Sequence, residues 1–292
     1  MNFLDDLKLQ YRTGGVAQRL IFWNVGIFLF SLLFFYRFAN GFFVLPNWLA
    51  LNSSWNIFST TPWTLFTYMF LHGGFLHLLF NMMVLNFAGR LFTTYFTERQ
   101  LLGLYFLGGM FSGIVFLISF LLLGSVSQLV GASGAIMALL VATAAYAPYM
   151  LLRMPLIGTV KLWQVAAVIV LIDLVQVPMN NTGGHIAHLG GALFGFLFVK
   201  LLQQGTDLTR GVSNIQDVFE EKMKGASKPK TPFKKVHKNP KNTTFSTSSK
   251  SSTHYDKELN QKKIDAILDK ISQSGYDSLS KEEKEFLFKV GK

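Results

Sequence analysis

Two long stretches of this chain contain no acidic and no basic residue, and they restrict the possible fold more than any other feature. They run from Phe38 to Gly89 and from Gln100 to Leu152. A helix that crosses a lipid bilayer needs about 20 apolar residues, so each stretch has room for more than one such helix. Of the 292 residues, 50% are hydrophobic and only 15% are charged, which is too apolar for an ordinary soluble domain. The sequence therefore predicts an all-α membrane protein.

The apolar segments and the turn-forming residues between them predict six membrane-spanning helices. We expect these helices at Leu20–Tyr36, Phe75–Phe92, Leu101–Leu123, Ala132–Ala147, Leu162–Val177 and Gly184–Leu202. The first is interpreted as an uncleaved signal anchor, because no small-residue cleavage site follows its apolar run. Ahead of the second, Trp48, Trp55 and Trp63 indicate a loop in the outer leaflet, since tryptophan is enriched at membrane interfaces.

The basic residues between these segments predict how the chain is oriented. Cytoplasmic connections of membrane proteins are enriched in lysine and arginine. Nearly all basic residues close to the predicted spans fall on one side, and Arg37 is the only one near the other. We therefore expect a multi-pass protein of the bacterial inner (cell) membrane, with both termini in the cytoplasm and the lipid bilayer as its surroundings.

The remaining charged residues are concentrated in the tail. Residues 1–205 contain nine of the 27 lysines and arginines and four of the 16 acids. The net charge of +11 therefore combines a sparsely charged membrane part with a highly charged tail, and we expect no nucleic-acid partner. We divide the chain into a juxtamembrane amphipathic segment (1–19), a six-helix domain (20–205), a basic disordered linker (206–255) and a small helical hairpin (256–292).

Within the tail, a serine and a glutamate are spaced for a helix start. Ser280 and Glu283 predict a capping box ahead of the second helix of the hairpin, in which each side chain bonds the backbone of the other. The role of the hairpin does not follow from its sequence.

A serine stands among residues with almost no side chain at the start of the fourth predicted span, in Gly131-Ala132-Ser133-Gly134. The first backbone N–H groups of a helix have no partner within it, so they can stabilise an oxyanion that forms beside the serine oxygen. Taken alone, a serine between small residues is more often a packing residue. The pattern is nevertheless suited to an exposed nucleophile.

Four histidines lie in or beside the predicted spans, and ionisable groups inside a membrane usually have a function. They are His72, His77, His185 and His188. The predicted topology places His77, Ser133 and His188 at one depth, just below the outer surface.

Small residues predict that two of the spans touch. His188, Gly191 and Gly195 share one face of the sixth span, while Gly134, Ala138 and Ala142 form a matching stripe on the fourth. If these faces meet, Ser133 and His188 lie side by side.

The chemistry expected from this arrangement is that of a serine–histidine dyad. His188 would take the proton from Ser133 and return it to the leaving amine, acting as general base and then as general acid. His77, Asn81 and the Ser133 backbone N–H would donate hydrogen bonds to the tetrahedral oxyanion. We expect no carboxylate beside the dyad and interpret Asp173 as a polar anchor or cap.

Less specific interpretations of these residues remain open. A histidine near an interface is often only an anchor, and Asn81 could simply link two helices. His185 and His188 lie one turn apart, but no His-Glu-x-x-His motif or carboxylate cluster accompanies them, so we expect neither a metal nor another cofactor. Because the chain has no cysteine, it has no disulfide, thiol nucleophile or cysteine-based metal site.

Three ordered motifs within about residues 18–203 resemble the rhomboid family of intramembrane serine proteases. Gly131-Ala132-Ser133-Gly134 is similar to the G-x-S-G nucleophile motif of that family. The segment from Ala187 to Gly195 is similar to its A-H-x-x-G-x-x-x-G helix, and the segment from Leu71 to Asn81 to its H-x-x-x-x-H-x-x-x-N segment.

The resemblance implies a six-helix rhomboid-like bundle in which Gly131, Gly134, Gly191 and Gly195 support close helix packing. It implies a serine-type endopeptidase that cleaves transmembrane segments of other membrane proteins. Such substrates would enter between the second and fifth spans, beneath a cap formed by Gln176–Gly183.

Two alternatives to a protease fit the sequence less well. A catalytically inactive relative that binds and escorts membrane proteins would lack the serine or the histidine, whereas Ser133 and His188 are both present. A transporter would show inverted repeats, and we find no convincing repeat. Trp63-Thr64 and Thr93-Thr94 replace the Trp-Arg pair and the glutamate of many rhomboid relatives, at positions that are structural in the family.

Overall fold

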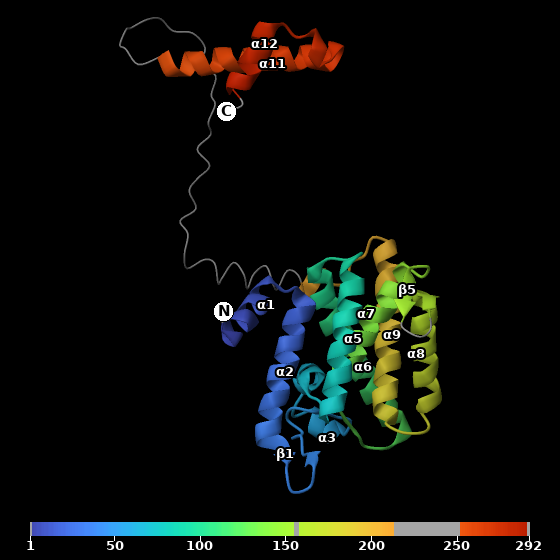
Figure 1. Ribbon diagram of the computed structural model, residues 1–292. Helices are drawn as coiled ribbons and strands as arrows, with labels where there is room; N and C mark the ends of the chain where they lie inside the picture. Colours follow the sequence, from blue (N-terminus) through green and yellow to red (C-terminus); the bar gives the residue numbers. More distant parts are fainter. Residues whose placement is uncertain (1, 155–157, 213–251, 291–292) are drawn as a thin grey trace, which may run out of the picture. The chain divides into compact units, whose positions relative to one another are not determined.

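The computed structural model describes residues 2–154, 158–212 and 252–290, which fall into two compact units (Figure 1). The units are Met1–Lys228 and Pro229–Lys292. Most of the predicted basic linker (206–255) lies outside the described residues, so the domain boundaries proposed from the sequence stay predictions.

The first unit is mostly helical, and each apolar segment singled out in the sequence forms a helix. The apolar helices are α2 (Val16–Phe35), α5 (Phe75–Thr93), α6 (Glu98–Leu123), α7 (Ser133–Tyr146), α8 (Leu162–Gln176) and α9 (Thr182–Gln203). Four of them, α2, α5, α6 and α9, are long and apolar enough to cross a membrane, whereas α7 and α8 are shorter. A further helix, α1 (Phe3–Thr13), forms where the sequence predicts an amphipathic one.

Helix α7 is the centre of this unit. It packs against α5, α6, α8 and α9, and ten of its 14 residues are buried (Figure 1). Because its sequence is apolar on every side, a fully surrounded position is the one in which it is stable. Its alanines and Gly134 leave little side-chain volume, so the neighbouring helices can approach its backbone closely. The residue at the start of α7 is thereby fixed relative to four helices.

The loop before α5 has more structure than the sequence indicated. It contains β1 (Tyr36–Arg37), β2 (Phe42–Phe43), β3 (Leu51–Asn52), α3 (Trp55–Phe58), α4 (Thr64–Thr67) and the 3-10 helix η1 (Tyr68–Phe70). Strand β3 pairs antiparallel with β4 (Gln128–Leu129), with Leu51 opposite Leu129. This pairing ties the loop to the segment that leads into α7. Strands β1 and β2 also pair with each other, and a third antiparallel pair, β5 (Leu151–Met154) with β6 (Gly158–Lys161), lies between α7 and α8.

The tryptophans of this loop are exposed, as expected for an interfacial segment, and one of them also holds the loop together. The Nε1–H of Trp63 donates to the Trp48 carbonyl at 2.8 Å. The next residue, Thr64, is buried, and its hydroxyl donates to the Thr61 carbonyl at 2.6 Å. Trp63-Thr64 therefore makes its own loop contacts.

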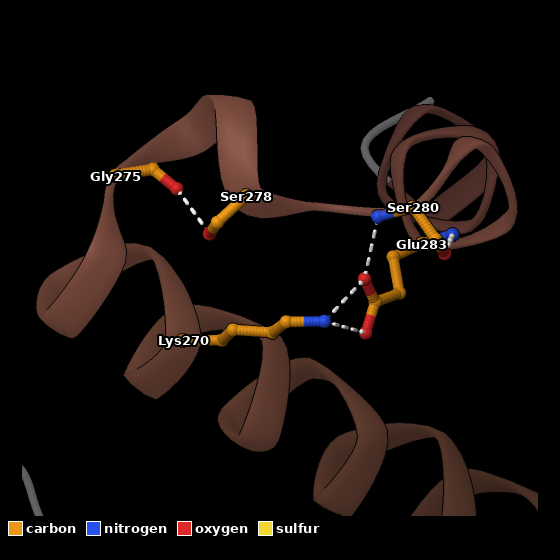
Figure 2. A network of polar contacts seen from close by, with 5 residues as sticks. All are labelled: Lys270, Gly275, Ser278, Ser280 and Glu283. Carbon is orange, nitrogen blue, oxygen red and sulfur yellow. Dashed lines mark hydrogen bonds and ion pairs between the residues drawn. The ribbon is translucent and has the colours of Figure 1, made fainter.

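The second unit contains a pair of helices. These are α11 (Ser252–Ser274) and α12 (Lys281–Val290), with the 3-10 helix η2 (Tyr276–Ser278) between them. The predicted capping box is confirmed, because the Glu283 N–H donates to the Ser280 hydroxyl at 3.2 Å and the Ser280 N–H donates to the Glu283 carboxylate at 2.8 Å (Figure 2). Lys270 of α11 binds the same carboxylate at 3.0 Å, which links the two helices (Figure 2).

Candidate active site

Ser133 is the first residue of α7, and the turn before it is held from both sides. Gly131 has a φ of +127°, a conformation that glycine adopts readily and other residues rarely do. Its N–H donates to the Tyr68 carbonyl at 3.0 Å, and the β3–β4 pair fixes the chain just upstream. As the first residue of a helix, Ser133 has no acceptor within α7 for its own N–H.

The predicted contact between the small-residue faces of α7 and α9 is confirmed. A Cβ added at Gly191 would overlap the backbone carbonyl of Gly134, and one added at Gly195 would overlap that of Ala138. At the end of the same contact where α7 and α9 begin, a Cβ on Gly134 would lie 3.3 Å from the Ala187 carbonyl oxygen. Ser133 and His188 each adjoin one of these touching residues, so they occupy the same end of the α7–α9 interface.

His77 faces the same space as the serine. The Gly73 N–H donates to His77 Nδ1 at 3.4 Å, which makes Nε2 the protonated nitrogen of the neutral ring. A Cβ built on Gly131 would lie 3.0 Å from His77 Nε2 and 3.6 Å from Ser133 Oγ, so both atoms border the small space above that glycine. The His77 N–H and the Ser133 N–H are therefore two donors beside one hydroxyl oxygen.

Asn81 lies one turn after His77 on α5 and is buried. Its Nδ2 donates to the His77 backbone carbonyl at 2.8 Å, which leaves the second N–H of the amide for another acceptor. The ring of His72 packs edge-on against that of His77, with 5.1 Å between the ring centroids. Asn81 and His72 therefore both steady the turn that carries His77.

A buried carboxylate lies beside His188, so the expectation that none is placed there was wrong. His188 Nδ1 is 2.8 Å from Asp173 Oδ1, and His185 Nδ1 is 2.7 Å from the same oxygen. Asp173 belongs to the last turn of α8 and is only 4% exposed. Between α8 and α9, Asn181 adopts a left-handed conformation with a φ of 48°. The chain reverses there, and the first turns of α9 return to the end of α8.

This contact decides which nitrogen of His188 can act as a base. A carboxylate accepts hydrogen bonds, so Nδ1 of His188 carries the proton and Nε2 keeps its lone pair. One signal in the sequence could have identified Asp173. It is the only acid within a predicted span, and such acids are functional by default.

The described residues contain one group of three side chains spaced closely enough to hold a metal ion. It consists of Asp173, His185 and His188, whose ligand atoms lie within 4.8 Å of one another. The nitrogen–oxygen distances of 2.7 and 2.8 Å are those of hydrogen bonds. Two ligands of a tetrahedral zinc ion would stand about 3.3 Å apart. The geometry thus favours a proton-mediated network.

Comparison with known proteins agrees with the motifs. Residues 59–205 match the rhomboid domain, and this range contains Ser133, Asp173 and His188. Residues 252–290 match a family of unknown function (DUF6576). No curated protein matches the chain. The rhomboid match covers half of the sequence, and the chain belongs to the rhomboid family.

Proposed function

We propose that this protein is an intramembrane serine endopeptidase, a hydrolase that cleaves transmembrane segments of other membrane proteins. The observation that supports the proposal is the close contact of α7 with α9 at Gly134 and Gly191, because Ser133 adjoins Gly134 and His188 adjoins Ala187, whose carbonyl lies beside Gly134. The rhomboid domain supports the same reading, because the family includes proteases.

In the first half of the reaction, Ser133 Oγ attacks the scissile carbonyl carbon while His188 Nε2 takes the hydroxyl proton. The carbonyl oxygen becomes an oxyanion, which the backbone N–H of Ser133 and the Nε2–H of His77 stabilise, with the free amide N–H of Asn81 as a further donor. When the C–N bond breaks, His188 gives its proton to the leaving amine. An acyl group then remains on Ser133.

In the second half, water replaces the amine. His188 Nε2 takes a proton from the water as its oxygen attacks the acyl carbon, and the proton passes to Ser133 Oγ as the ester bond breaks. The products are a carboxylic acid and the regenerated hydroxyl. No cofactor is needed for either half.

The short length of α7 explains how water reaches a site within the membrane. We propose that all six apolar helices cross the bilayer with both termini in the cytoplasm. At 1.5 Å per residue the 14 residues of α7 extend about 21 Å, less than the roughly 30 Å of the hydrocarbon core. Ser133 would thus lie below the outer surface, enclosed by protein and open to water from above. Substrates would enter between α5 and α8.

The test compares three variants on a model transmembrane substrate in liposomes. Ser133→Ala and His188→Ala should each lower turnover by at least ~10³-fold, because neither half reaction proceeds without both groups. Ser125→Ala, at an exposed serine after α6, is the matched control and should cleave normally. A serine-directed fluorophosphonate should label wild type and not Ser133→Ala.

Normal turnover in either dyad variant would exclude this mechanism. A wild-type protein that binds transmembrane segments but neither cleaves them nor takes up the probe would favour the alternative, an inactive rhomboid-like binding or escort factor.

A further inference from the structure

We propose that Asp173 is a positioning residue for the general base, so that the site works as a Ser133–His188–Asp173 triad, with His185 as a second donor that holds the carboxylate. This inference rests on the proposed protease function and extends it to a residue outside the dyad.

The burial of Asp173 needs an explanation that packing does not provide. It is the only carboxylate among the buried residues that the structure describes, and its Oδ2 has no hydrogen-bond partner there. A carboxylate removed from water is strongly unfavourable unless its charge is matched. A leucine or asparagine would fill the same volume between α8 and α9 without that penalty. A catalytic need for the negative charge accounts for its presence.

The geometry shows what the charge does. Both imidazoles approach the same oxygen, Oδ1, at 2.7 and 2.8 Å, which are the short distances of charge-assisted hydrogen bonds. The contact fixes the His188 ring and keeps its proton on Nδ1, so Nε2 is the ring nitrogen that is left to accept a proton. When Nε2 takes the serine proton, the ring becomes an imidazolium, and the adjacent carboxylate stabilises that positive charge while remaining ionised.

His185 has a different role from His188 because of where it lies. It stands one turn earlier on α9, and its ring contacts Asp173 and, edge-on, the ring of His188. By donating to Oδ1 it holds the carboxylate against α9. Removing it leaves the contact between Asp173 and His188 intact.

Two substitutions of Asp173 separate a positioning role from a purely structural tie between α8 and α9. Asparagine keeps the size and loses the charge, whereas glutamate keeps the charge and adds a methylene group to a packed site. If the carboxylate only joins the helices, Asp173→Asn should be the more stable and the more active variant. If its charge assists the base, Asp173→Glu should be the more active although it is the less stable.

The experiment measures kcat, KM and the thermal unfolding midpoint for full-length wild type and these variants in liposomes or detergent. We expect Asp173→Asn to lower kcat by ~10²–10⁴-fold, as loss of the carboxylate does in serine proteases, with KM within about threefold of wild type. Asp173→Glu should recover part of kcat. Ser125→Ala, at an exposed serine outside the site, is the control and should keep wild-type kcat and KM.

The pH profile gives a second readout that a structural role would not change. The titratable groups that face His188 are Asp173 of α8, His185 of its own helix α9 and His77 of α5. Without the carboxylate the imidazolium is less stable, so the acid limb of kcat/KM should move to lower pH in Asp173→Asn. An unmoved limb together with wild-type kcat would overturn the proposal.

If neither variant folds, ¹⁵N spectra of the wild-type histidines decide the question. The neutral His188 ring should carry its proton on Nδ1, and a proton on Nε2 would overturn the proposal. The experiments distinguish failure of the protease proposal from failure of the positioning role proposed for Asp173. Active Ser133→Ala would exclude the protease mechanism itself, whereas inactive Ser133→Ala with fully active Asp173→Asn would exclude only the positioning role.

Discussion

Two polar networks of this chain, one around Asp173 and one around Glu283, each centre on a carboxylate and differ in burial. In the membrane-type unit Asp173 is 4% exposed and binds two imidazoles from the next helix. In the tail unit Glu283 lies at the surface and binds a lysine and the start of its own helix (Figure 2). Water can compete for the partners of Glu283 far more easily than for those of Asp173, whose side chain is only 6% exposed. Removing one partner from the buried network should therefore destabilise the fold strongly. The exposed network only caps the start of α12 and links it weakly to α11.

The largest effect on folding and cleavage should come from breaking the contact between α7, which begins at Ser133, and α9, which carries His185 and His188. Gly191→Leu would place a side chain on the Gly134 carbonyl, which cannot move because α7 is surrounded. We expect loss of the folded protein and of all cleavage, measured by thermal unfolding and by turnover. Gly26→Leu is the matched control, because a Cβ there meets no atom within 4 Å. A folded, active Gly191→Leu would show that α7 and α9 can separate.

An intermediate effect should follow from removing one donor of the buried network. His185→Ala leaves Asp173 bound to His188 and opens a cavity, so we expect the free energy of unfolding to fall by about 1–3 kcal/mol while turnover stays within ~10-fold of wild type. Thermal unfolding and cleavage assays on one sample check both. Complete loss of turnover with normal folding would identify His185, rather than His188, as the base.

The smallest effect should come from the exposed network, and it depends on pH. The Ser280 N–H, with Lys270, holds the pKa of Glu283 below its usual value of 4.5. Since the folded-state pKa is the lower one, the stabilisation is present above about pH 4.5 and is lost as the pH falls through the folded-state pKa. A peptide of residues 252–292 should lose helical circular dichroism over that range.

The matched pair for this measurement is Glu283→Gln and Glu285→Gln. Glu283→Gln should remove the loss of helical circular dichroism at acid pH. Glu285→Gln, at an exposed glutamate of the same helix, should show the same loss as wild type. Identical acid transitions in both variants would show that the capping box contributes nothing measurable.

Local patterns in the sequence were enough to predict the helices and the contact between two of them. Charge-free runs marked the apolar helices, and the spacing of Gly191, Gly195 and Gly134 predicted the α7–α9 interface because helical faces repeat with a fixed period. The contacts of Asp173 were not predicted, because its partners lie 12 and 15 residues away, across a reversal of the chain. The β3–β4 pairing was not predicted either, because Leu51 and Leu129 are far apart in the sequence and meet only in the folded unit.

The three groups of the proposed triad come from three successive helices, in the order Ser133 on α7, Asp173 on α8 and His188 on α9. A ribosome therefore delivers the nucleophile first and its base last. Until α9 has emerged and packed onto α7, the half-made chain holds a serine without its proposed base. If the proposed function holds, biosynthesis keeps the protease inactive towards other membrane proteins until its own helices have assembled.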